Sequence, residues 1–320
     1  MDVCLMIEGQ EDVTWEQWVG LALACEEHGF AALFRSDHYL SFGHPADWGT
    51  LDAWATLAAL ASRTSRIHLG TLVSPVAFRH PSQLAKSVVT ADHASAGRVE
   101  LGMGAGWFEA EHRAYGFPFP PTRDRMDMLE EQVEIVHRLW DRDEDEVSFD
   151  GRHYRLEAVH ALPKPVQDPH PRLILGGEAR PRGAGLAARW ADEYNMNFCT
   201  ADDCQEGRRR LDAACEAAGR DPSTLPLSVM TNALVGADER ELERRAARQM
   251  ARRGQTGDPR EFLESLGPER IAGTPARVLE RLAEYATAGV RRVMLQHLLH
   301  DDLEAVALIG SEIIPEAASL

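Results

Sequence analysis

Short apolar segments alternate with longer helical segments along nearly the whole chain, and this alternation most limits the possible folds. Eight apolar segments have the length and composition of buried strands; they cover residues 3–8, 31–36, 66–75, 97–104, 172–175, 192–198, 227–235 and 290–296. Strands that alternate with helices form parallel sheets. Eight of them, without a polar linker between the halves, predict a (β/α)8 TIM barrel over residues 1–320, as one domain, rather than an open sheet.

Helix-boundary signals agree with this alternation. Thr14 and Gln17 have the spacing of a capping box, and Gly29 is placed to end the helix that follows. Near the other end of the chain, Thr274 is predicted to cap a helix with proline at its first-turn position, and Gly289 to end it.

The alternation is interrupted after residue 116, which predicts an insertion of about residues 116–170 on the C-terminal face of the barrel. This segment contains a proline-rich stretch, a helix over about residues 122–140, and the alternating sequence VSFDGRHYRL, typical of a hairpin with Asp150 and Gly151 at its turn. A second polar stretch, GQTGDPREF at residues 254–262, is predicted to be mobile or lid-like.

Composition excludes several classes of partner. The chain has 320 residues, 44% of them apolar, which suffices for one large core, and its formal net charge is −17. Without a run of lysines or arginines it is poorly suited to nucleic acid or an anionic membrane. The first apolar segment is too short for a secretory signal and no segment is long enough to span a bilayer, so we expect a cytoplasmic protein.

The cysteines do not predict a metal site. There are five, at Cys4, Cys25, Cys199, Cys204 and Cys215. Cys199 and Cys204 lack the second pair or the histidine cluster that zinc requires. We therefore expect small buried thiols and no metal.

Ligands of such barrels bind at the carboxyl ends of the strands, and the stretch from Arg66 to Trp107 supplies two such ends in succession. Asp37 and His38 follow the second strand. A carboxylate beside an imidazole can hold a proton near neutral pH, which predicts a catalytic pair; capping of the following loop is the alternative. We expect the joint replacement of Asp37 by Asn and His38 by Ala to lower turnover far more than stability.

Five stretches together carry a family resemblance. In chain order they are AALFRSDHYL, IHLGTLVSPVAFRHPSQLAK, GRVELGMGAGWFEAEHRAYGFPFPP, LILGG followed by AARWADEYN, and GTPARVLERLAEYATAGV. Over nearly its whole length the chain resembles the luciferase-like monooxygenase superfamily, in its deazaflavin-dependent branch. The resemblance implies a TIM-barrel oxidoreductase that binds the deazaflavin coenzyme F420, or FMN, and that is commonly a homodimer.

The resemblance also implies which residues meet the cofactor ring. Members of this branch press the backbone at the end of the third strand against the ring face, through a non-proline cis bond or a bulge. By position this bond is Leu72–Val73, next to Ser74, and an ordinary trans strand end is the alternative. Gly104 and Gly106 lack the spacing of a dinucleotide fingerprint, and we expect them to let the fourth strand and its loop pass close to the ring.

Two positions concern the proton and the substrate. Some relatives carry a proton-transferring acid at the end of the first strand, which adds Glu8 to the catalytic candidates; an exposed loop-start glutamate is the alternative. Relatives that oxidise sugar phosphates carry a glutamate acid at the position of Trp107, so the resemblance does not extend to that reaction. We expect the Trp107 side chain to form a wall for the substrate or for the cofactor ring. The side chains that follow, Glu109, Glu111 and His112, are predicted mostly to be solvated or paired.

The anionic tail of the cofactor is expected at Gly176 and Gly177. Without Cβ atoms their amides can approach an anion, and the N-terminus of the following helix adds favourable charge. Arg180 and Arg182 supply cations in a chain whose net charge repels an anionic tail.

Two histidines are further candidates at the same rim. His80 is expected either to face the substrate or to cap the helix that follows it, and His297 comes just after the eighth strand.

The sequence therefore predicts an F420-dependent oxidoreductase that exchanges hydride with a small apolar or carbonyl-containing organic substrate. The first alternative is an FMN-dependent monooxygenase that receives reduced flavin from a partner reductase and activates oxygen. A non-redox or binding-only barrel is a remote alternative, because neither an activated nucleophile nor a metal cluster is evident at the strand ends.

Overall fold

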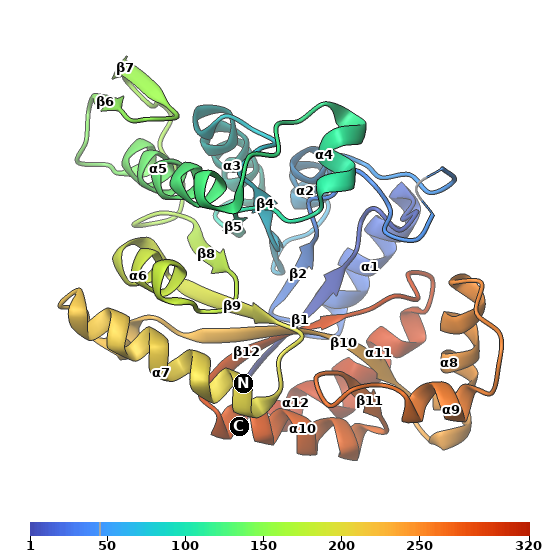
Figure 1. Cartoon of the computed structure of the whole chain (residues 1–320). Coiled ribbons are helices and arrows are strands. Elements are labelled where there is room, and N and C mark those ends of the chain that lie inside the picture. Colours follow the sequence, from blue (N-terminus) through green and yellow to red (C-terminus); the bar gives the residue numbers. More distant parts are fainter. Residues whose placement is uncertain (45) are drawn as a thin grey trace.

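A computed structural model describes residues 1–44 and 46–320. Eight parallel strands form a closed ring in the order β1, β2, β3, β5, β8, β9, β10, β12, and β12 pairs with β1 again (Figure 1). Their bounds are β1 Asp2–Ile7, β2 Ala32–Arg35, β3 His68–Thr71, β5 Val99–Gly104, β8 Arg172–Gly176, β9 Glu193–Asn197, β10 Leu227–Val235 and β12 Val290–Gln296. The predicted (β/α)8 barrel is confirmed.

Helices surround this ring, each following a strand. They are α1 Trp15–Glu27, α2 Ala53–Ala61, α3 Pro81–Ser95, α5 Thr122–Trp140, α6 Pro181–Trp190, α7 Ala201–Ala217, α8 Glu239–Arg252, α10 Pro275–Thr287 and α11 Leu303–Glu312. Neighbouring helices contact one another around the barrel, for example α2 with α3 and α6 with α7. Shorter elements complete the fold: β4 Ser74–Pro75, α4 Glu109–Tyr115, β6 Val147–Asp150, β7 Arg155–Val159, η1 Pro222–Thr224, α9 Pro259–Glu264, β11 Ile271–Gly273 and α12 Ile314–Ala317.

Several boundary predictions are confirmed and others are corrected. The Thr14 capping box forms with both of its hydrogen bonds. Thr274 occupies the N-cap position of α10, but its side chain makes no capping hydrogen bond. After the second strand, the sequence of residues 50–63 is typical of a helix from about residue 50, but α2 begins only at Ala53, because the carboxylate of Asp52 accepts the N–H of Ala55 and fixes the N-terminus there.

The segment predicted as an insertion has two different parts. Helix α5 lies in the ring of helices, where it contacts α3 and α6, and three of its residues line the cavity described below. The hairpin β6–β7 packs along α5: the carboxylate of Glu131 accepts backbone N–H groups of Arg152, His153 and Tyr154. The stretch predicted as lid-like, residues 254–262, contains the start of α9, which Asp258 caps.

The interior of the barrel is apolar in its middle and charged at its floor. Cys4, Phe34 and Ile174 belong to a buried cluster inside the ring. Below them, at the N-terminal ends of the strands, the Arg292 guanidinium contacts the carboxylates of Glu100 at 2.6 Å and Glu193 at 3.2 Å. This buried triad fills the floor, which leaves the opposite end for ligands.

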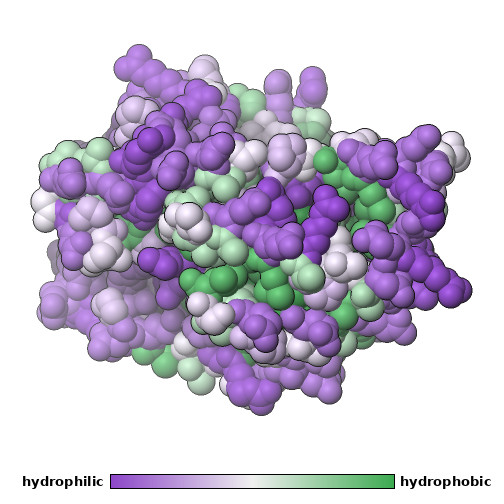
Figure 2. Space-filling model, turned by 90° about the horizontal axis from the view of Figure 1, so that it is seen from below, coloured by the Kyte–Doolittle hydropathy of each residue, from purple (hydrophilic) through white to green (hydrophobic). Residues whose placement is uncertain are grey.

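The outer surface is mostly hydrophilic on the face that Figure 2 shows. On this face hydrophobic residues gather in small areas. Among the described residues no helix is both long enough and apolar enough to cross a membrane.

Candidate active site

A cavity of about 1200 Å³ lies at the C-terminal ends of the barrel strands. Its wall includes residues that follow β1, β2, β3, β5 and β8, so the strand ends predicted to form a site do converge. This volume exceeds the range of about 300–1,000 Å³ that is usual for small-molecule sites.

Val73, just after β3, is central to one part of the cavity wall. The peptide bond between Leu72 and Val73 is cis, as the resemblance implies, and both residues line the cavity. The Val73 side chain lies beside three glycines: a Cβ on Gly104 would lie 2.7 Å from it, and one on Gly102 or Gly176 would lie 3.0 Å from it. These glycines therefore make room for Val73, which is a packing reason that the sequence did not reveal.

One wall carries an imidazole–carboxylate pair. His38 Nδ1 lies 2.7 Å from Glu111 Oε1, and the side chain of Glu111 is only 1% exposed. The second oxygen of Glu111 accepts the backbone N–H of Tyr39 at 3.0 Å, which fixes the carboxylate. His38 lines the cavity, and with Nδ1 occupied by Glu111 its Nε2 is the ring nitrogen left for a ligand.

This pair changes the proton affinity of His38. Burial disfavours the charged imidazolium, but the hydrogen bond and charge of Glu111, helped by Glu8 and Asp37, outweigh burial and raise the pKa of His38 above its ordinary value. The imidazole therefore keeps its proton to a higher pH than a free histidine does.

Aromatic rings surround His38. Its ring centroid lies 5.0 Å from that of Phe42, 5.8 Å from that of Trp107 and 6.2 Å from that of Phe108, all in edge-on geometry. Trp107 is 64% exposed although it contacts these rings. An exposed indole at the cavity wall is a surface for a planar or apolar ligand.

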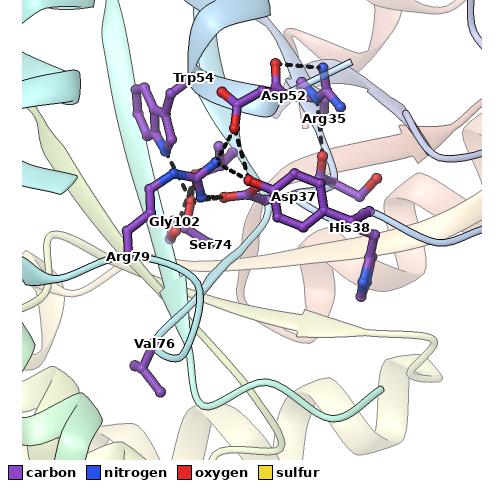
Figure 3. A network of polar contacts seen from close by, with 12 residues as sticks. Arg35, Asp37, His38, Asp52, Trp54, Ser74, Val76, Arg79 and Gly102 are labelled. Carbon is purple, nitrogen blue, oxygen red and sulfur yellow. Dashed lines mark hydrogen bonds and ion pairs between the residues drawn. The ribbon is translucent and has the colours of Figure 1, made fainter. Parts of the chain in front are cut away.

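Asp37 does not contact this pair but belongs to a separate buried network. Its carboxylate lies 2.5 Å from the guanidinium of Arg79 and accepts a hydrogen bond from the Ser74 hydroxyl at 2.7 Å. Arg79 also contacts Asp52 at 2.7 Å, and the Trp54 indole N–H donates to Ser74 Oγ. In Figure 3, His38 points away from this network. Asp37 and Ser74 are not among the residues that line the cavity.

Glu8 is buried in the cavity wall. It is 7% exposed, and its two oxygens accept hydrogen bonds from the side-chain amides of Gln10 at 2.8 Å and Gln296 at 2.5 Å. The alternative of an exposed loop-start glutamate is therefore wrong.

The end of the cavity near α6 contains the predicted tail-binding residues. The N–H of Gly177 donates to the carbonyl of Asn195, so it is not free for an anion. A Cβ on Gly177 would lie 2.8 Å from the hydroxyl of Tyr194, which explains the glycine by packing. Arg180, the N-cap residue of α6, makes no side-chain capping hydrogen bond, which leaves N–H groups of the first turn for a ligand.

The two arginines at this end are already paired. Arg180 contacts Glu178 at 2.6 Å, and Arg182 contacts Glu130 at 2.7 Å and the carboxylate of Asp127. Both arginines line the cavity, but their charges are partly balanced there.

Comparison with known proteins decides the family. The family model described as luciferase-like monooxygenase matches residues 3–292. The chain belongs to the luciferase-like monooxygenase family. This confirms the family and the oxidoreductase class that the resemblance implies.

Relatives within the luciferase-like family differ in the reactions their names describe. An F420-dependent glucose-6-phosphate dehydrogenase of Nakamurella multipartita is 29% identical over 94% of this chain and 92% of its own. The structure of the monooxygenase RslO1 from Streptomyces bottropensis superimposes with a TM-score of 0.83 at 24% identity, covering 98% of this chain and 99% of the other. The structure of an F420-dependent secondary alcohol dehydrogenase superimposes with a TM-score of 0.82 at 20% identity, covering 99% of this chain and 98% of the other. At these identities the two structures establish the shared fold alone.

The remaining predicted residues of this luciferase-like protein are placed as follows. His80 caps α3 by accepting the N–H of Ser82, so its helix-entry role is the one observed. His297 is 5% exposed and does not line the cavity. Gly106 and Trp107 do line it. Within residues 1–44 and 46–320 no cysteine forms a disulfide, and no cluster suited to a metal ion occurs.

Three residues of the site escaped the sequence reasoning. Glu111 was expected to be solvated or paired, and only the fold brings it to His38 across 73 positions of sequence. Gln249 and Arg252 line the cavity from α8, whose polar sequence gave no signal for a binding role. The sequence offered one hint for Glu111, which is its position in an aromatic-rich stretch after a strand.

Proposed function

We propose that this protein is an F420-dependent oxidoreductase that exchanges hydride with a small organic substrate. The observation that carries the proposal is the contact of His38 with the buried Glu111 on the wall of a large cavity, because such a pair supplies the proton that accompanies a hydride. A relative named as F420-dependent, aligned over 94% of the chain, supports the choice of cofactor.

The residues present fit a tricyclic cofactor. The cavity is large enough for a ring system together with a substrate. The backbone at Leu72 and Val73, with Gly104 and Gly106 beside it, would lie against the ring, and the first turn of α6 would hold an anionic tail. Arg180 would contribute charge to that end.

When bound, F420 supplies a hydride acceptor or donor, and the protein supplies orientation and proton transfer. In reduction of a carbonyl, the protonated His38 would donate from Nε2 to the substrate oxygen; in oxidation of an alcohol, the neutral ring would take that proton. Glu111 holds the ring through Nδ1 and stabilises its positive charge. Glu8 is proposed as a second proton-handling group, since its carboxylate lies in the same wall.

The substrate is proposed to be other than a sugar phosphate. Trp107 takes the place of the acid that the resemblance assigns to sugar-phosphate oxidation, and its exposed ring favours apolar or planar molecules.

An FMN-dependent monooxygenase with a partner reductase is the second candidate, and one measurement separates the two. The purified protein is titrated with F420 and with FMN, and binding is followed by cofactor absorbance. Tight binding of F420 supports the proposal. Tight binding of FMN alone would overturn it in favour of the monooxygenase.

We also propose that residues 1–320 act as one barrel domain, that the protein is cytoplasmic and that it forms a homodimer. The exposed Leu23 on α1 and Leu303 on α11 lie on helices that contact each other, which offers apolar surface for a second copy. Size-exclusion chromatography with light scattering tests the dimer, and a monomeric mass at micromolar concentration would contradict it.

A further inference from the structure

Gln249 on α8 is a buried amide that has no hydrogen-bond partner within residues 1–44 and 46–320. Its side chain lines the cavity and the residue is 2% exposed, yet within the described part of the chain it makes no hydrogen bond, and its Oε1 is fully enclosed. An unsatisfied buried polar group costs about 1–3 kcal/mol. A 180° turn of the terminal amide exchanges its oxygen and nitrogen, so this side chain can offer either a donor or an acceptor to a ligand.

Arg252 lies one turn further along α8 and also lines the cavity. Its guanidinium donates to the backbone carbonyl of Glu11, lies 3.4 Å from His300 Nδ1 and stacks on the Trp48 ring at 4.7 Å. None of these groups is a carboxylate. Burial, with the charge of Arg252 and the nearby His297, lowers the pKa of His300 to about 3, so this imidazole is neutral.

A second guanidinium that the described residues leave unpaired lies beside Arg252 at this end of the cavity. Arg253 lines it as well, and its side chain forms no ion pair with the rest of the described chain. Two carboxylates of the segment after β1, Glu8 and Glu11, line the cavity as well. Glu8 accepts hydrogen bonds from Gln10 and Gln296. Glu11 accepts hydrogen bonds from Ser41 Oγ and the Phe42 N–H, both at 3.1 Å. Arg252 and Arg253 thus line the cavity without an ion pair to any carboxylate of residues 1–44 and 46–320, in a protein whose net charge is −17.

We infer that Gln249 and Arg252 form a subsite for an anionic oxygen group of the substrate, preferably a carboxylate. A carboxylate matches the guanidinium through two parallel hydrogen bonds, and the amide of Gln249 can donate a third. The inference rests on the proposed function, and it assigns the α6 end of the cavity to the anionic tail of the cofactor.

The segment between β2 and α2 connects this subsite with the proton-transfer pair. Its Phe42 contacts the ring of His38, and its Trp48 lies under Arg252. A substrate with a planar or apolar body would therefore lie along these aromatic side chains, with its reacting carbon near His38 and its carboxylate at Arg252.

The test uses benzoate and benzamide, two planar probes of nearly equal size that differ in charge. Each is titrated by calorimetry into wild-type protein saturated with F420. Benzoate is expected to bind at least tenfold more tightly than benzamide. Gln249→Met, which keeps the volume and removes the hydrogen-bonding groups, and Arg252→Gln, which removes the charge, are each expected to abolish most of that preference.

Arg260→Gln is the matched control. It removes the same charge from the neighbouring helix α9, where Arg260 pairs with Glu243 at 2.6 Å and does not line the cavity. This variant is expected to keep the preference for benzoate. The dissociation constant of F420 is measured for every variant, and it is expected to stay within twofold of wild type.

Two outcomes would overturn the inference. One is equal binding of the two probes to wild-type protein. The other is a loss of F420 affinity in the Gln249 and Arg252 variants without a loss of benzoate preference, because the anion held there would then be the cofactor tail. Failure of the wild type to bind F420 would instead contradict the proposed function, and the same titrations without cofactor would still decide the subsite.

Discussion

Glu111 controls the charge of His38, and Glu111→Gln separates that effect from geometry. Glutamine keeps an oxygen near His38 Nδ1 but removes the negative charge, so the pKa of His38 should fall. Substrate reduction needs the protonated ring, and its alkaline limb is therefore expected to move to lower pH, with a rate at pH 7.5 reduced roughly tenfold or more. The pH dependence of kcat/KM measures this.

A control for Glu111 exists on the same helix. Glu109 also lies on α4 but is exposed, and Glu109→Gln should leave the pH profile unchanged. A profile that shifts equally in both variants would mean that a general change in charge, not the contact with His38, is responsible.

Replacements of Asp37 and His38 should have different effects, and the joint variant should lose stability as well as turnover, contrary to the expectation from sequence, because Asp37 pairs with the buried Arg79. Asp37→Asn leaves the buried guanidinium of Arg79 with only the partly exposed Asp52 as an ionic partner, and removing one member of a buried pair costs about 3–5 kcal/mol. His38→Asn should instead reduce turnover roughly 100-fold or more with little change in stability. Urea unfolding and steady-state kinetics of the two single variants distinguish these effects.

Asp47→Asn is the control for the charge change, since Asp47 is exposed in the same segment. If Asp37→Asn unfolds at the wild-type urea concentration, the ion pair is not a stabilising element and Asp37 returns to the list of catalytic candidates.

At the scale of elements, the end of β3 and the strands β5 and β8 depend on one another through Val73. Gly104→Ala would place a methyl group 2.7 Å from the Val73 side chain, and such overpacking costs about 1–3 kcal/mol. Val73→Ala should relieve the clash, so the double variant is expected to be more stable than Gly104→Ala alone. Denaturant unfolding of Gly104→Ala, Val73→Ala and the double variant gives the interaction free energy between the two positions.

Gly49→Ala controls for the intrinsic effect of the substitution, because a Cβ there meets no atom within 4 Å. Additive losses in the double variant would show that the two positions do not interact.

The elements were predictable from sequence where local signals and burial agreed. All eight barrel strands were found, because each is a short apolar segment between helices, and β10 is buried along its whole length. The helix expected at Glu109, Glu111 and His112 is α4. The short elements α9 and β11 were missed, since three to six residues carry too little periodicity. The site was only partly predictable: the strand ends located it, but the His38–Glu111 contact depends on tertiary packing.

At the scale of the whole molecule, two buried histidines should make the fold sensitive to mild acid. Burial lowers the pKa of His297 to about 4 and that of His300 to about 3. In the unfolded chain both imidazoles have a pKa near 6.5. Above that pH they do not oppose folding, and the free energy of unfolding falls as the pH decreases toward their pKa values in the folded protein. The expected loss at pH 5 is roughly 2 kcal/mol for each imidazole.

Thermal unfolding between pH 7 and pH 5 tests this expectation. The variant His300→Gln, which cannot gain that proton, should lose less stability over the same interval. His38 affects the free energy of unfolding in the opposite direction. Its pKa is raised in the folded protein, so it stabilises the fold at low pH, and this stabilisation disappears as the pH rises through that pKa. A melting temperature that is constant from pH 7 to pH 5 would contradict the assignment of neutral buried rings.

The charged triad of Arg292, Glu100 and Glu193 at the barrel floor has a kinetic consequence. Since that end is filled, both molecules of a two-ligand reaction must come and go through the same mouth. A large cofactor seated on Val73 would occupy the deeper position and block its own departure while a smaller molecule lies above it. Catalysis in this barrel should therefore follow a compulsory sequence, in which the cofactor enters first and leaves last.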